Sequence, residues 1–167
     1  MKRSSSIFVL LFFLSGCATI TPPLLEKPIE REKIFSVNYD RLWEAGISVF
    51  IKSSGILSTI DKQSGVMAIV NTLNSQDLKD FVIERPPSFP WGCYFGNGQV
   101  YINAIFSKVD ENSTRLYLKT KILANLFNAY GYPLQFNVPL TSNGKLEEEI
   151  FKKLSAELGL VQYDYLR

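Results

Sequence analysis

Histidine is absent from this chain of 167 residues, and its absence excludes several kinds of catalytic site. Histidine is the usual general base near neutral pH and the commonest metal-binding side chain. A Ser-His-Asp or Cys-His arrangement cannot be built here, nor can a zinc site of the ordinary histidine-containing type. The carboxylates that remain as candidate acids are best interpreted as solvated charges at strand ends and turns: Asp61, Asp77, Asp80, Glu84 and Asp110. We predict no enzymatic activity, no catalytic residue and no metal site.

An excess of positive charge is also missing. The chain has 18 Lys and Arg against 16 Asp and Glu, and two of the basic residues are Lys2 and Arg3 at its start. Without those two, the charges balance. Because a nucleic-acid-binding surface needs basic residues to displace the phosphate counterions, we predict no nucleic-acid partner.

The N-terminal apolar run is too short to span a bilayer, which needs about 20 apolar residues. Residues 7–14 are apolar, follow Lys2 and Arg3, and precede the small residues Ser15 and Gly16. A charged start, a short apolar segment and small residues are typical of a secretory leader. Residues 1–16 are therefore predicted to be a signal peptide.

Leu14, Ser15, Gly16 and Cys17 resemble the bacterial lipobox, in which the cysteine becomes the lipid-modified first residue of the mature protein. The resemblance implies a diacylated Cys17 thioether, which is the only cofactor-like group expected; an ordinary cleaved leader is the alternative. Two acyl chains hold a protein stably on a bilayer without a transmembrane helix. In lipoproteins of two-membraned bacteria, an aspartate directly after the lipid-modified cysteine retains the protein at the inner membrane. The resemblance therefore implies, from Ala18 at this position, attachment to the outer membrane, facing the periplasm.

Cysteine is scarce, and acylation of Cys17 would leave Cys93 as a lone thiol in an oxidising compartment. One interpretation is an intermolecular disulfide. The other, which we favour, is a small buried hydrophobe, because Cys93 lies among Trp91, Tyr94 and Phe95 and unpaired cysteine is commonly buried.

The remainder divides into a tether and one domain. Residues 17–33 contain Pro22, Pro23 and Pro28 among alternating charges and show no helical or strand period. Such a chain reaches at most about 50 Å from the bilayer. Residues 34–167 are predicted to form a single domain.

The domain has the pattern of an α+β fold. Apolar residues with helical spacing predict helices over residues 38–54 and 146–158, ended by left-handed Gly55 and Gly159. Strands are predicted, in chain order, over residues 34–37, 56–60, 66–72, 76–84, 100–107, 115–122 and 134–138. Residues 85–98 are predicted as a loop, and residues 125–132 as a loop or a short helical turn. Helices at both ends of a strand-rich chain favour a single antiparallel sheet with two helices packed on one face.

Residues 35–71 resemble the repeated unit of BamC, the lipoprotein accessory of the outer-membrane β-barrel assembly machine. The points of resemblance are Tyr39, Leu42, Trp43, Gly55, Ile56, Asp61, Ser64, Gly65 and Val66. The resemblance implies a helix-grip fold. The chain has room for one such unit where BamC has two, and no partner-binding residue carries across.

These observations favour a non-catalytic, lipid-anchored envelope protein that docks on another envelope protein. The aromatic residues of the long loop are the candidate surface for a partner or ligand: Phe89, Trp91, Tyr94 and Phe95. The alternative is a carrier that holds a small apolar ligand or lipid between the sheet and the long helix, with Trp43 and Phe50 beside that groove. The other interpretation, which we favour, is that these rings fill the core.

Overall fold

The structure, a computed structural model, describes residues 29–53, 55–83 and 92–160. The predicted signal peptide, Cys17 and most of the predicted tether lie outside these residues. The described elements are, in chain order, β1 (Glu32–Phe35), α1 (Tyr39–Lys52), β2 (Ile56–Asp61), β3 (Val66–Asn74), α2 (Ser75–Phe81), β4 (Tyr94–Lys108), β5 (Thr114–Phe127), β6 (Pro133–Leu140) and α3 (Lys145–Glu157).

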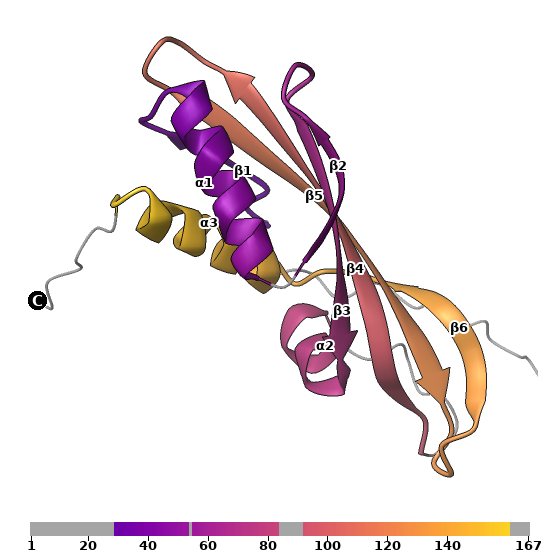
Figure 1. Cartoon of the computed structure of the whole chain (residues 1–167). Coiled ribbons are helices and arrows are strands. Elements are labelled where there is room, and N and C mark those ends of the chain that lie inside the picture. The colour runs from indigo at the N-terminus through magenta and orange to yellow at the C-terminus, as the bar shows by residue number, and fades with distance from the viewer. Residues whose placement is uncertain (1–28, 54, 84–91, 161–167) are drawn as a thin grey trace, which may run out of the picture.

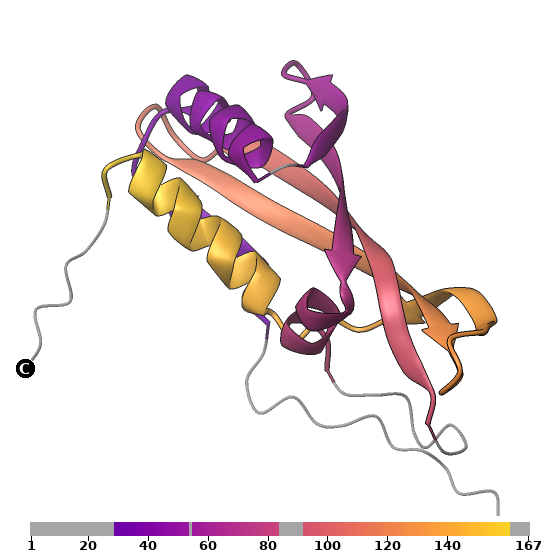
Figure 2. The ribbon, with the colours of Figure 1, turned by 60° about the horizontal axis from the view of Figure 1, so that its bottom comes forward.

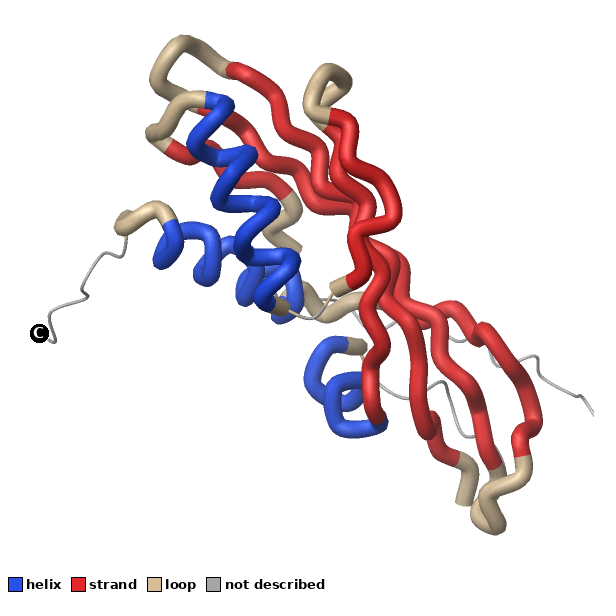
Figure 3. The backbone as a smooth tube through the Cα atoms, viewed as in Figure 1, coloured by secondary structure: helices blue, strands red, loops and turns tan. Residues whose placement is uncertain are grey.

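The strands form one antiparallel sheet in the order β1-β5-β4-β3-β2. β1 and β6 share one edge of β5, where β1 pairs with residues 114–117 and β6 with residues 122–127. The strands make one twisted layer, and the helices lie on one side of it (Figures 1, 2 and 3). The predicted α+β fold with a single antiparallel sheet is confirmed.

α1 forms because its first turn is capped and one of its sides is apolar. The side chain of Asn38 accepts a hydrogen bond from the Arg41 amide at 2.9 Å, which satisfies a free N–H of the first turn. The ring of Trp43 packs edge-on against Phe106 of β4, with ring centroids 5.1 Å apart. At Gly46 a Cβ atom would lie 2.8 Å from the Phe106 ring, so α1 approaches the sheet closely because no side chain intervenes.

The core lies between this face of the sheet and the helices. The inward residues predicted for the central hairpin are all buried: Val100, Ile102, Ala104, Phe106, Leu116, Leu118 and Ile122. α1 and α3 supply the apolar residues that cover them: Leu42, Trp43, Val49, Phe50, Ile150, Phe151 and Leu154. The apolar residues that alternate along the strands and those that recur with helical spacing along α1 and α3 thus pack together in one core cluster.

The strand predicted over residues 76–84 is wrong, because residues 75–81 form α2. The Asn74 side chain accepts hydrogen bonds from the Gln76 and Asp77 amides, and the Asp77 carboxylate accepts one from the Asn74 amide. This capping box begins a helix despite its short length. The fold therefore has a third helix, whose Leu78 reaches the core.

Other boundaries also differ from the prediction. β4 begins at Tyr94, inside the predicted loop over residues 85–98, and β5 extends to Phe127, inside the predicted loop over residues 125–132. A register shift between Phe95 and Gly98 lets the two strands continue pairing across the glycines there. β1 begins at Glu32, two residues earlier than expected, within the last residues assigned to the tether.

Gly55 does not end α1 by a left-handed conformation, since it is absent from the residues with positive φ, whereas Gly159 has φ 70° as predicted. Ser53 caps the helix instead, and its hydroxyl donates to the Val49 carbonyl. A Cβ atom at Gly55 would lie 2.6 Å from the Ile69 side chain. Glycine is needed there for the close approach of the chain to β3.

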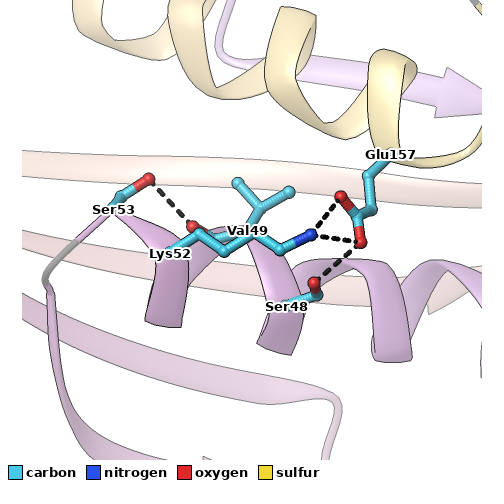
Figure 4. A network of polar contacts seen from close by, with 5 residues as sticks. All are labelled: Ser48, Val49, Lys52, Ser53 and Glu157. Carbon is cyan, nitrogen blue, oxygen red and sulfur yellow. Dashed lines mark hydrogen bonds and ion pairs between the residues drawn. The ribbon is translucent and has the colours of Figure 1, made fainter.

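α1 and α3 are joined by a polar network around Glu157 (Figure 4). The Glu157 carboxylate accepts hydrogen bonds from Lys52 Nζ at 2.8 Å and from the Ser48 hydroxyl at 2.7 Å. The Lys52 ammonium, and to a smaller extent Ser48, lowers the pKa of Glu157 below its ordinary value near 4.5. Because the pair is solvated, its contribution to stability is small.

The lowered pKa of Glu157 predicts a pH dependence. A carboxylate with a depressed pKa in the folded state stabilises the fold above its unfolded pKa, and this stabilisation is lost as the pH falls through the folded pKa. Urea unfolding should therefore find Glu157→Gln less stable than the wild type at neutral pH, with the difference shrinking below about pH 4. A difference that stays constant across this range would contradict the assignment.

Two neighbouring residues of α1 test the packing of the helix layer. Phe50 is buried in the core and Ile51 is exposed. Phe50→Ala should lower the free energy of unfolding by about 3–5 kcal/mol. Ile51→Ala, with the same backbone context, should change it by about 0.5 kcal/mol or less. Equal effects in denaturant titrations would mean that α1 does not pack as described.

Candidate functional site

The predicted aromatic surface is only partly described. Phe89 and Trp91 lie outside the described residues. Tyr94 and Phe95 are the first residues of β4 and take different sides of the sheet: Tyr94 is exposed, whereas Phe95 is half-buried and packs on the core. Cys93, just before them, is half-buried. Two of the four predicted residues are thus described by the structure, and of these two Tyr94 faces solvent.

Tyr94 belongs to a larger group, here named the aromatic end, which lies where β4 begins and β5 and β6 meet. Its members are Tyr94, Phe127, Tyr130, Tyr132, Leu134 and Phe136. The rings of Tyr94 and Phe127 stack with centroids 5.7 Å apart. This end of the sheet projects past α1 and α3 (Figure 1). The sequence prediction of a loop at residues 125–132 missed the group.

The side of the sheet opposite α1 and α3, here named the open face, is crossed by regular rows of side chains. Registers across β3, β4 and β5 align Val66 with Ile105 and Tyr117, Ala68 with Asn103 and Lys119, and Val70 with Tyr101 and Lys121. The valines, Ala68 and the two tyrosines are half-buried, and Ile105 is exposed. The open face thus presents small and aromatic apolar groups between polar ones.

Three basic residues of β5, here named the basic row, lie along the open face: Arg115, Lys119 and Lys121. The Arg115 guanidinium lies 3.8 Å from the Glu32 carboxylate of β1. Lys119 and Lys121 are exposed, and the residues of β3 and β4 that line the open face carry no charge. Two carboxylates lie in the same rows at the edges of the sheet, Glu32 beside Tyr117 and Asp61 beside Val66, so the open face carries a small net positive charge.

An open depression of about 290 Å³ lies where the open face meets the aromatic end. It is lined by Thr72, Asn97, Gly98, Gln99, Leu123, Asn125, Phe136 and Asn137. The Asn125 side chain donates to Asn97 Oδ1 at 2.9 Å and accepts from the Asn137 amide at 3.2 Å. Asn137 has the left-handed conformation, with φ 56°, and the three asparagines all line the depression.

The depression is not the groove that the carrier hypothesis requires. That groove was expected between the sheet and the long helix, beside Trp43 and Phe50. Both rings are buried core residues, and Trp43 stacks on Tyr39 as well as meeting Phe106. The core interpretation holds for these two rings.

Sequence reasoning also missed the role of Glu147, which lies in the first turn of α3. Its side chain is 1% exposed. One carboxylate oxygen accepts from the Thr120 hydroxyl of β5, and the other accepts from the Ser142 hydroxyl at 2.8 Å. The carboxylate thereby fixes the start of α3 to the sheet. No local signal reveals this role, because Thr120 is distant in the sequence.

Removing the Glu147 carboxylate should destabilise the fold. Glu147→Ala leaves the buried Ser142 hydroxyl without its acceptor, and such a loss costs about 1–3 kcal/mol. Glu149→Ala, in the same turn but exposed, is the matched control and should cost about 0.5 kcal/mol or less. Similar denaturation midpoints for the two variants would contradict the bridging role of Glu147.

Over residues 29–53, 55–83 and 92–160, no three His, Cys, Asp or Glu side chains are grouped so that they could hold a metal ion. Within the same ranges, no helix has the length and apolar character needed to span a membrane.

Comparison with known proteins does not assign these surfaces. No family model matches the chain, and no curated protein matches it. The resemblance of residues 35–71 to the BamC unit stays a prediction. Function is therefore argued from the residues of this chain.

Proposed function

We propose that this chain is a non-catalytic lipoprotein of the bacterial envelope, anchored to the outer membrane through Cys17, and that its open face docks on another envelope protein. The observation that carries the anchor is the order of a charged start, a short apolar run and Leu14-Ser15-Gly16-Cys17. Acylation would concentrate the domain at the membrane without a transmembrane helix. A tethered domain of this kind acts through whatever its uncovered surface binds.

The open face supports the docking part of the proposal. Its half-buried Tyr101 and Tyr117 supply the aromatic contact area that protein interfaces favour. Lys119 and Lys121 lie beside these rings, and among the described residues neither forms an ion pair with a carboxylate. The partner that fits is a protein with an acidic surface, since charge complementarity speeds association and selects the partner.

Acylation is tested first, by mass analysis of the protein purified from membranes. We expect a diacylglyceryl group on Cys17 and residue 17 as the first residue. Cys17→Ser should prevent cleavage of the leader before residue 17, and mass analysis should then detect no acylated protein. A native protein whose terminus carries no lipid would refute the anchor.

Docking is tested by a photocrosslinking amino acid at Asn103, an exposed position in the middle of the open face. We expect one discrete protein adduct in intact membranes, lost when Lys119→Glu and Lys121→Glu are combined. The control crosslinker at Lys153, on the exposed side of α3, should not give this adduct, and Lys152→Glu should not remove it. No adduct, or one insensitive to the charge reversal, would refute docking by the open face.

A further inference from the structure

We infer that the aromatic end is a second membrane contact, which rests in the headgroup region of a lipid bilayer. The inference rests on the proposed function only for the anchor that brings the domain to the membrane. The aromatic end is exposed, its segments lack charge, the backbone of its turn is hydrogen-bonded, and the chain before the domain is long enough to bring it to the bilayer.

The side chains of the aromatic end face water to an unusual degree for such large apolar groups. The exposed fractions are 47% for Tyr94, 87% for Tyr130, 68% for Tyr132, 54% for Leu134 and 62% for Phe136. Single exposed apolar residues are ordinary, but a group of five at one end of a sheet marks a contact surface. Tyrosine is enriched at membrane interfaces, where the ring meets the acyl region and the hydroxyl meets water.

Charge is missing from the chain segments that build this end. Residues 92–107 and 122–144 contain no Asp, Glu, Lys or Arg. Lysine and arginine are typical of solvated surfaces, and each charged group moved toward the bilayer interior costs free energy. The lack of charged residues does not stabilise a surface that contacts only water. For a surface that enters the headgroup region, it lowers the free-energy cost of leaving water.

The backbone of the turn between β5 and β6 is already hydrogen-bonded within the turn. Asn128 Oδ1 accepts from the Tyr130 amide at 3.0 Å and from the Tyr132 amide at 2.9 Å. The Asn128 amide donates to the Tyr132 carbonyl, and the Gly131 amide donates to the Asn128 carbonyl, each at 3.0 Å. Because these groups need no water as a partner, moving the turn out of water carries a smaller desolvation cost.

The chain before the domain is long enough to allow this placement. Ile29 lies beside Gly144, at the start of α3, where a Cβ atom on the glycine would be 3.2 Å from the Ile29 side chain. β6 connects the aromatic end to this region with eight residues, a span of about 26 Å. The chain from Cys17 to Ile29 can reach about 40 Å, so an anchor at Cys17 and the aromatic end can meet one bilayer.

The first experiment places a nitroxide at either end of the sheet in the acylated full-length protein. Tyr132→Cys labels the aromatic end, and Asn112→Cys labels the turn between β4 and β5 at the opposite end, both in a Cys93→Ala background. The protein is inserted into vesicles of phosphatidylethanolamine and phosphatidylglycerol without any other protein. We expect the label at residue 132 to become protected from a water-soluble nickel complex and accessible to oxygen. The label at residue 112 should stay water-exposed.

A second measurement does not need the acyl group. The Cys17→Ser chain is therefore tested without residues 1–16, because the uncleaved leader would itself bind lipid. It should partition weakly onto the same vesicles, and Tyr132→Asp should lower this partition by about tenfold, while Asn112→Asp leaves it unchanged. Since Tyr132 is exposed, its replacement should not alter the thermal melting curve, which is checked for each variant.

The outcomes separate this inference from the proposed function. An acylated protein whose label at residue 132 stays as water-exposed as the label at residue 112 overturns the membrane contact and leaves the anchor in place. The same result is expected if the aromatic end instead binds a protein, because the vesicles contain none. A native chain without a lipid on Cys17 refutes the anchor, while partition of the Cys17→Ser chain still decides whether the aromatic end binds lipid.

Discussion

The packing of α1 and α3 against one face of the β4–β5 hairpin is the contact on which the rest of the structure depends. Trp43 and Phe106 meet edge to face, and Gly46 lets the helix come close enough for that contact. The Glu157 network and the buried Glu147 carboxylate then fix α3 beside α1 and to the sheet. The helices bury the apolar side chains on one face of each strand. The side chains on the other face remain exposed to solvent or to a binding partner.

The lengths of the elements explain why part of the sheet is uncovered. β4 has 15 residues and spans about 50 Å, whereas α1 has 14 residues and spans about 21 Å. Helices of this length cannot cover strands of that length. α2 shields part of the remainder through Leu78, which lies beside Gly98, and the aromatic end extends beyond. The aromatic end follows from this incomplete cover, whereas the open face is uncovered because the helices all lie on the other side of the sheet (Figures 1 and 2).

Local patterns predicted most of the elements. Of the two candidate caps before α1, Asn38 and Asp40, the structure has Asn38, and the turn through Asp61 and Gly65 joins β2 to β3, with Gly65 at φ 73°. The resemblance residues of this region have packing and turn roles here, as when the Tyr39 hydroxyl donates to the Lys62 carbonyl. α2 was missed although Leu78, Phe81 and Val82 have the i, i+3, i+4 spacing of a helix, because so short a segment offers few apolar positions and the Asn74 capping box was overlooked.

The sequence by itself determined the absence of histidine chemistry, the balance of charge, the lipobox-like motif and the inward side of each long strand, because these depend on residue types and on spacing within one segment. Only the tertiary structure decided that Glu147 is buried, that Trp43 and Phe50 belong to the core, and which side chains gather at the aromatic end. Those outcomes depend on contacts between segments distant in the chain, such as Thr120 with Glu147, and no local period encodes them.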